Sequence, residues 1–123
     1  MKIHMDLKQL TKENEAFRRV LETGKYSQVV VMSIPKGERI GEETHEKTDQ
    51  IFYFVEGRAE VVVNGKLESV EKNEIVFIPA GTKHDIRNVG QDSLKLFTVY
   101  APAKHPAGLV QKTKNEESAT VRR

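Results

Sequence analysis

Residues 75–88 read Ile75-Val76-Phe77-Ile78-Pro79-Ala80-Gly81-Thr82-Lys83-His84-Asp85-Ile86-Arg87-Asn88, and they contain the most informative pattern in the chain. The apolar run at 75–78 is typical of a strand, and Pro79 ends it because proline cannot donate to a strand ladder. Gly81 permits a tight backbone turn, after which His84 leads into a second strand at 85–89. The stretch therefore predicts two strands joined by a short turn.

Glycine and proline interrupt the rest of the chain at similarly short intervals. The runs between them are rich in valine, isoleucine, phenylalanine and tyrosine, and they predict strands at 17–22, 26–34, 50–55, 59–63, 66–70, 75–78, 85–89 and 94–100. Asn64-Gly65 is the strongest hairpin signal, because both central residues of a type I′ turn need positive φ. Residues 6–15 predict one weak helical turn. We expect an all-β fold, as a sandwich or a barrel.

The chain has 123 residues, which fits one domain, and 37% of them are hydrophobic, which allows a core without covalent cross-links. With 20 basic and 18 acidic residues the net charge is +2, so charge does not favour nucleic acid or an anionic membrane as a partner. Residues 1–20 lack a signal-peptide pattern, and no stretch is apolar enough to span a membrane. We expect a cytoplasmic protein with its barrel at 1–110 and a flexible polar tail at 111–123.

The absence of cysteine restricts any transition-metal site to histidine, carboxylate, amide oxygen and water ligands. Side chains alternate between the faces of a strand, so Glu43 and His45 share one face, and Gln50 can join them after a turn at 46–49. His84 can reach the same interior from the opposite side. Two imidazoles, a carboxylate and an amide oxygen suit zinc, iron, manganese, nickel or copper. These residues predict a divalent metal site.

Each of these residues also has a plainer interpretation. Glu43 stands in a charged run that is typical of a solvated loop, and His45 taken alone fits a surface position. Gln50 is a weak, neutral ligand that can instead hydrogen-bond a metal-bound water or a substrate. His84 is the strongest candidate ligand, because it follows the Pro-x-Gly turn.

The region from 79 to 88 resembles the second of two sequence motifs of the cupin superfamily. That motif is a glycine, then Pro-x-Gly-x-x-His, then an asparagine four residues later. It is matched by Pro79, Gly81, His84 and Asn88, while Asn73 stands where the leading glycine is expected. The resemblance covers residues 26–100 and includes the hairpin at Asn64-Gly65.

The region from Gly41 onward resembles the first motif, in which a His-x-His pair is followed by a glutamate and then a glycine. The closing spacing fits Gln50 and Gly57, which puts Glu43 and His45 at the pair. The resemblance therefore implies a ligand set of Glu43, His45, Gln50 and His84. Its one carboxylate, Glu43, stands in place of the first family histidine, and Gln50 stands in place of the family glutamate. This pattern is similar to a bacterial cupin branch loosely labelled mannose-6-phosphate isomerase-like.

The resemblance implies a single double-stranded β-helix, or jelly-roll, barrel with an N-terminal strand extension and a divalent zinc, iron, manganese or nickel ion at its mouth. It also implies a small-molecule ligand and a homodimer. Cupins include isomerases, epimerases, oxygenases and pure binding proteins, so the fold does not choose a reaction. We expect an isomerase or epimerase acting on a small sugar-like molecule. A non-catalytic ligand-binding or sensing protein and a metal-dependent dioxygenase are the alternatives.

Six further residues are predicted around the pocket. Phe52, Phe54, Phe77 and Phe97 are expected to pack the core and to line the pocket as well. Lys83 lies beside His84 and is a candidate ligand contact, although a solvent-facing role is simpler. His105 belongs to a loop that can cross the barrel mouth.

Overall fold

The computed structural model describes residues 1–115. In chain order its elements are α1 (Leu7–Glu13), β1 (Arg18–Thr23), β2 (Gln28–Ile34), β3 (Asp49–Glu56), β4 (Ala59–Val63), β5 (Lys66–Val70), β6 (Ile75–Ile78), β7 (His84–Asn88), β8 (Leu94–Ala101) and β9 (Val110–Gln111). Each strand predicted from the sequence is present, with its ends shifted by no more than two residues. The weak helical turn is α1, which begins after Asp6, whose carboxylate accepts a hydrogen bond from the Gln9 backbone N–H.

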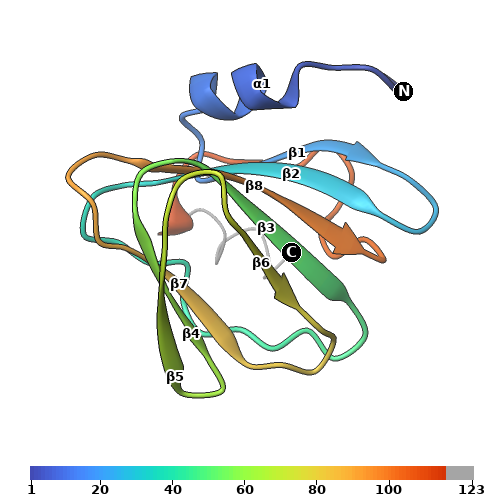
Figure 1. The fold of residues 1–123 in the computed structure, drawn as a ribbon. Coiled ribbons are helices and arrows are strands. Elements are labelled where there is room, and N and C mark those ends of the chain that lie inside the picture. Colours follow the sequence, from blue (N-terminus) through green and yellow to red (C-terminus); the bar gives the residue numbers. More distant parts are fainter. Residues whose placement is uncertain (116–123) are drawn as a thin grey trace.

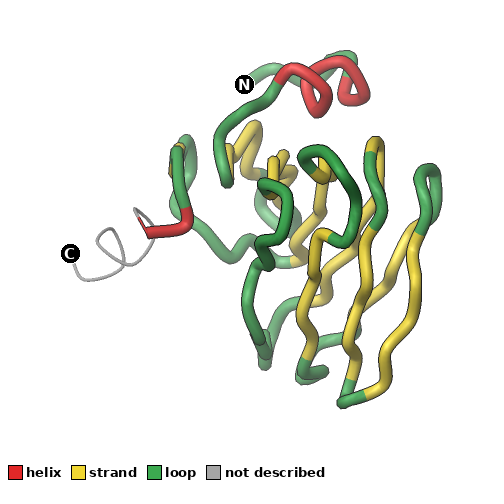
Figure 2. Tube along the Cα trace, turned by 90° about the vertical axis from the view of Figure 1, so that its left-hand side faces the viewer, coloured by secondary structure: helices red, strands yellow, loops and turns green. Residues whose placement is uncertain are grey.

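Two antiparallel sheets form the barrel (Figure 1). The larger sheet has the order β6-β3-β8-β2-β1-β9, and the smaller one has the order β5-β4-β7. Val30, Met32 and Phe52 of the larger sheet share one hydrophobic core with Val61 and Ile86 of the smaller sheet. The predicted all-β jelly-roll barrel is therefore confirmed. The helix α1 packs on the outside of the larger sheet, against β8, β2 and β3 (Figure 2).

The alternation of side chains along β3, β6 and β8 separates the predicted core residues into two groups. Phe52 and Phe54 are fully buried, as predicted. Ile78 points into the core. Because side chains alternate between the two faces of a strand, its neighbour Phe77 points outward and is 54% exposed. Phe97 alternates with buried Leu96 on β8 and stacks on Tyr53 at 5.0 Å, on the outer face. Placing Phe77 and Phe97 in the core was wrong, because apolar residues occupy both faces of these strands.

Two of the turns require the residues found there. Asn64 and Gly65 have φ of 49° and 81°, as the predicted type I′ turn between β4 and β5 demands. Gly57 has φ of 97°, and a Cβ placed on it would lie 3.2 Å from both Cα and Cδ1 of Leu94. Asn73, which stands where the family motif has glycine, has φ of 72°. Asparagine tolerates this left-handed conformation better than other non-glycine residues, so the replacement preserves the turn.

The short strand β9 was not predicted. It pairs with β1 through Arg18 and Arg19, and Gln111 is buried with its Oε1 accepting a hydrogen bond of 2.9 Å from Arg18 Nη1. The expected polar tail therefore starts with a residue that is fixed to the barrel, while 116–123 lie outside the described residues. Within residues 1–115, no helix is long and apolar enough to cross a membrane.

Candidate metal centre

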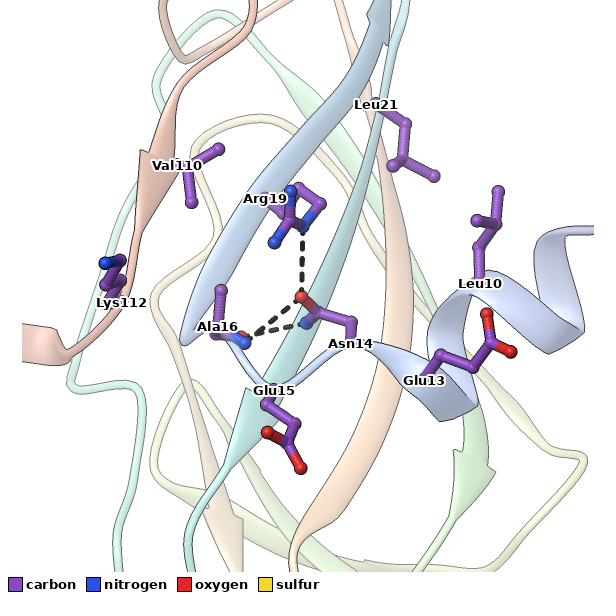
Figure 3. Close-up of a pocket in the computed structure, with 9 residues that line it drawn as sticks. All are labelled: Leu10, Glu13, Asn14, Glu15, Ala16, Arg19, Leu21, Val110 and Lys112. Atoms are coloured by element: carbon purple, nitrogen blue, oxygen red, sulfur yellow. Dashed lines mark hydrogen bonds between the residues drawn. The ribbon is translucent and has the colours of Figure 1, made fainter.

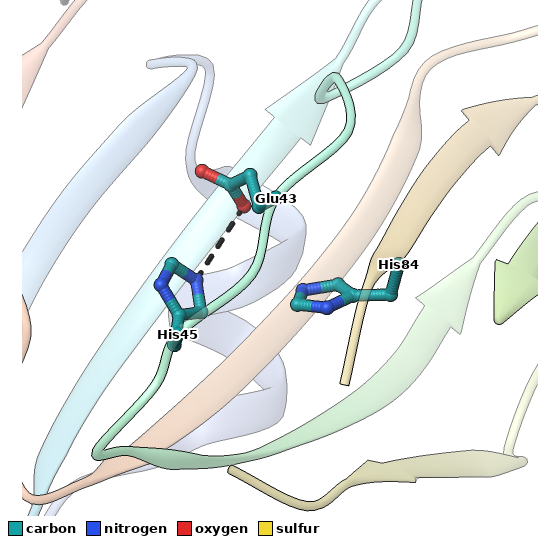
Figure 4. Close-up of side chains that lie close together, drawn as sticks. All are labelled: Glu43, His45 and His84. Carbon is teal, nitrogen blue, oxygen red and sulfur yellow. Dashed lines mark ion pairs between the residues drawn. The ribbon is translucent and has the colours of Figure 1, made fainter. Parts of the chain in front are cut away.

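Glu43 and His84 are brought together by their backbones. The Glu43 N–H donates to the His84 carbonyl at 2.8 Å, and the His84 N–H donates to the Glu43 carbonyl at 2.9 Å. Residues paired in this way across an antiparallel bridge project their side chains to the same face. The Gly81 N–H donates to the His45 carbonyl at 2.8 Å, so the Pro-x-Gly turn also holds His45. Figure 4 shows the three side chains converging inside the barrel.

The three side chains offer one ligand atom each within 4.8 Å of one another. The Nε2 atom of His45 lies 3.7 Å from Oε1 of Glu43, which is an electrostatic contact rather than a close hydrogen bond. The rings of His45 and His84 have their centroids 5.5 Å apart. Both histidines are buried, and the Glu43 side chain is 24% exposed. The site therefore opens toward solvent on the side of its carboxylate.

His84 has one ring nitrogen with a free lone pair inside the barrel. Its Nδ1 lies 2.9 Å from the carbonyl oxygen of Thr82, which can only accept, so Nδ1 carries the proton and donates. Nε2 is then the unprotonated nitrogen, and it is buried without a hydrogen-bond partner among residues 1–115. A backbone carbonyl that fixes the tautomer and the orientation of a ring in this way is the usual support of a metal-ligating histidine.

Gln50 is fixed in a comparable way from β3. Its Nε2 donates to Thr98 Oγ1 at 3.0 Å, and its Oε1 is buried without a partner in the described part of the chain. The amide is 1% exposed, so water does not satisfy that oxygen freely. A buried acceptor without a partner costs about 1–3 kcal/mol, which makes such an atom a pointer to a missing ligand.

The charge of Glu43 suits a cation. Burial by itself raises the pKa of Glu43, but contact with the His45 ring and the positive charge of Arg18 outweigh it, so the pKa lies below its ordinary value. Glu43 is therefore an ionised carboxylate at neutral pH, beside two imidazoles. Nε2 of His45, Nε2 of His84 and Oε1 of Gln50 are all buried and lack a hydrogen-bond partner within residues 1–115. These nitrogen and oxygen donors fit a divalent transition metal.

The other predicted pocket residues are divided between the site and the surface. The Phe52 ring lies 6.0 Å from the His84 ring and stacks on Phe54, so Phe52 borders the cluster and Phe54 packs behind it. Lys83 is exposed and lies 3.8 Å from a Glu42 carboxylate oxygen, outside the barrel. Phe77 and Phe97 lie on the outer face and do not reach the pocket.

His105 is connected to the cluster through Tyr100, a residue that the sequence motifs did not indicate. The Tyr100 ring lies edge-on to His45 at 5.8 Å and to His105 at 5.1 Å. The strand pattern contained the signal for Tyr100, because it is in phase with the inward-facing residues Leu96 and Thr98 of β8. Arg18 was also missed, since nothing in its local sequence marks a buried arginine.

Comparison with known proteins identifies the family. The Cupin domain family matches residues 30–100, the part of the chain that carries both motifs. The chain belongs to the cupin family. The crystal structure of BH2720 from Bacillus halodurans has a TM-score of 0.94 to this cupin and 41% sequence identity, covering 97% of this chain and 95% of that one.

Two curated relatives differ in how much of their length is matched. The uncharacterized protein YrkC of Bacillus subtilis is 38% identical over 94% of this cupin, which spans 65% of that relative. A mannose-1-phosphate guanylyltransferase of Salmonella montevideo is 31% identical over 68% of the cupin but over 18% of its own length. The shared region is thus a small part of that enzyme.

Proposed function

We propose that this cupin holds one divalent cation through Glu43, His45 and His84, with the Gln50 oxygen as the fourth ligand, and uses it to bind a small polar molecule. The observation that carries the proposal is the approach of two buried imidazoles, each with an Nε2 that lacks a hydrogen-bond partner in residues 1–115, to one ionised carboxylate. Such a cluster is costly unless a cation occupies it. Zinc, iron, manganese and nickel all suit this donor set.

We propose isomerisation or epimerisation of a sugar-like molecule as the activity. A bound cation would supply Lewis-acid polarisation of a carbonyl or hydroxyl oxygen. The protein would contribute an ionised Glu43 on the open side, an apolar floor at Phe52 and Phe54, and a polar wall at Tyr100. The distant relative named for mannose 1-phosphate supports a sugar-related ligand.

A binding or sensing role without chemistry is the second candidate. The observation that favours it is the neutral amide of Gln50, which leaves Glu43 as the one carboxylate in the described ligand cluster. A cluster of two histidines and one carboxylate also suits an iron-dependent dioxygenase, because it leaves coordination positions open. The activity experiment below separates these three possibilities.

Metal binding is tested by calorimetric titration of chelator-treated protein with Zn²⁺, Mn²⁺, Fe²⁺ and Ni²⁺. Wild type is expected to bind one ion, and His45→Ala and His84→Ala are expected to bind at least about tenfold more weakly, since each removes a ligand. His4→Ala is the matched control, because His4 is an exposed histidine near the N-terminus. Equal affinities in all four proteins would refute the proposed site.

The reaction is tested with a panel of aldoses, ketoses and diketones, with each metal and with or without oxygen. Metal-stimulated interconversion of sugars that disappears in His84→Ala supports the isomerase. Oxygen consumption with a diketone supports the dioxygenase instead. Ligand-dependent thermal stabilisation with no turnover supports the binding protein.

The proposal includes a cytoplasmic homodimer. Sedimentation analysis at working concentration tests the dimer, and a single species with the mass of one chain would contradict it. The location is tested separately, by fractionating cells that express the full-length protein. Recovery in the soluble cytoplasmic fraction is the expected result.

A further inference from the structure

Gln28 fastens the loop between β8 and β9 to the barrel. It lies in β2 and is 1% exposed. Its Oε1 accepts hydrogen bonds from the backbone N–H groups of Lys104 and His105, at 3.2 and 3.1 Å. Its Nε2 donates to the His105 carbonyl at 2.7 Å and to Thr23 Oγ1 at 2.9 Å. The whole hydrogen-bonding capacity of one buried amide is thus used, and three of the four bonds hold a single dipeptide.

The dipeptide is held where the His105 ring packs against Tyr100, which also contacts the candidate ligand His45. Nε2 of His105 lies 3.3 Å from the Tyr100 hydroxyl, and the two rings meet edge to face. Tyr100 in turn meets the His45 ring. His105 is not a member of the cluster of close ligand atoms formed by Glu43, His45 and His84. It therefore stands beside the centre, one ring removed from a candidate ligand.

The protonation state of His105 suits a hydrogen-bonding role. Burial, helped by the positive charge of Arg18, lowers the pKa of His105 to about 4, although the negative charge of Glu43 opposes the shift. A neutral imidazole has one donor and one acceptor nitrogen, so it can bond a hydroxyl or a carbonyl oxygen. Within residues 1–115, the Tyr100 contact at Nε2 is the one side-chain hydrogen bond of this ring.

We propose that His105 is a ligand-binding residue of the metal centre, which hydrogen-bonds a hydroxyl or carbonyl oxygen of a small molecule, and that Gln28 is the residue that positions it. This inference rests on the proposed function, because it takes the cation as the second anchor of the same molecule. If the loop had a purely structural role, the hydrogen bonds from Gln28 to Lys104 and His105, here called the Gln28 clamp, would still be needed. Removing the His105 ring would then have no effect on ligand binding.

The experiment uses the full chain loaded with Co²⁺ and, as the probe, acetohydroxamate, which carries a carbonyl and a hydroxyl oxygen. The visible absorption of Co²⁺ reports both metal loading and probe binding. The variants are His105→Ala, His105→Asn and Gln28→Met, which keeps the length of the side chain without its amide. Gln91→Met is the matched control, because Gln91 is exposed in the turn before β8.

His105→Ala and Gln28→Met are each expected to raise the Kd of the probe about fivefold, the effect of losing one hydrogen bond. The Kd of Co²⁺ is expected to change less than about twofold, because neither residue is a ligand. His105→Asn recovers part of the loss, since its amide restores a polar group on the same loop. Hydrogen exchange at the amides of Lys104 and His105 accelerates in Gln28→Met but not in His105→Ala.

Wild-type affinity for the probe in His105→Ala overturns the inference while leaving metal binding intact. Failure of the wild-type chain to bind Co²⁺ contradicts the proposed function itself, and the inference with it. If Gln28→Met does not fold, as judged by near-ultraviolet circular dichroism, the alanine and asparagine variants of His105 decide the question alone.

Discussion

Glu43 and His84 exchange two backbone hydrogen bonds of 2.8 and 2.9 Å, although they belong to different sequence motifs. This bridge fixes their side chains on the same face, so their convergence does not depend on the flexible parts of either side chain. The backbone therefore positions both groups before any ligand arrives. Pre-positioned donors lose little conformational entropy when they bind, which favours affinity.

Metal binding should stabilise the fold measurably. At a concentration about 100 times its Kd, a metal that binds only the folded state adds about 2.7 kcal/mol to the free energy of unfolding. We expect Zn²⁺ or Mn²⁺ to raise the thermal midpoint of the wild-type chain and a chelator to reverse the shift. His84→Ala should show no shift in the same thermal scan. A metal-induced shift of equal size in that variant would place the ion elsewhere.

Replacing the amide of Gln50 by a carboxylate should couple stability to metal loading. Gln50→Glu adds a negative charge at a position that is 1% exposed, in an interior that already holds the ionised Glu43. Without metal we expect a loss of about 1–3 kcal/mol in the free energy of unfolding, and with metal a tighter Kd, because the cation compensates the charge. Denaturant unfolding with and without metal measures both effects. Gln91→Glu, on the surface, should change neither.

The glycine of the first motif should be required for a steric reason. Gly57→Ala forces a Cβ to within 3.2 Å of Leu94 at a φ of 97°. We expect a loss of about 2–3 kcal/mol in the free energy of unfolding, from the clash and the left-handed backbone together. Gly37→Ala has a similar φ of 80° but nothing within 4 Å, so it should lose about 1 kcal/mol. Equal losses would show that the contact with Leu94 is not tight.

Acid should weaken the fold through His105. Its pKa is about 4 in the folded chain, below the value near 6.5 of an unfolded histidine. The unfolded state therefore binds more protons between these values, and stability falls as the pH is lowered from 6.5 to 4. Because the ring is partly exposed, we expect a contribution of about 1–2 kcal/mol over this range. His105→Asn should flatten the wild-type dependence by that amount in denaturant titrations of the metal-free protein, and identical slopes would contradict the assignment.

Sequence patterns predicted the elements better than the faces of the strands. The Asn64-Gly65 turn and the strands on either side of it were predicted correctly, because a positive φ at two adjacent residues is a local requirement. Phe77 and Phe97 were assigned to the wrong face, since β6 and β8 carry apolar residues on both faces and hydrophobicity alone does not set their phase.

Contacts between residues far apart in the sequence were the main limit on predicting the site from the sequence. The motif spacing predicted that Glu43, His45, Gln50 and His84 approach one another. In the structure, ligand atoms of Glu43, His45 and His84 lie within 4.8 Å of one another. The clamp from Gln28 to His105 joins β2 to a loop near the end of the chain. No local pattern encodes that contact. Strand β9 was missed for the same reason, since its two residues are held by pairing with β1 rather than by their own propensity.

Anomalous X-ray diffraction from crystals equilibrated with Mn²⁺ or Zn²⁺ locates the cation itself and so decides whether these three residues bind it. We expect one strong anomalous peak per chain, in contact with the Glu43 carboxylate and with a ring nitrogen of each of His45 and His84. No peak between these three residues at saturating metal, or a peak held by other side chains, would contradict it.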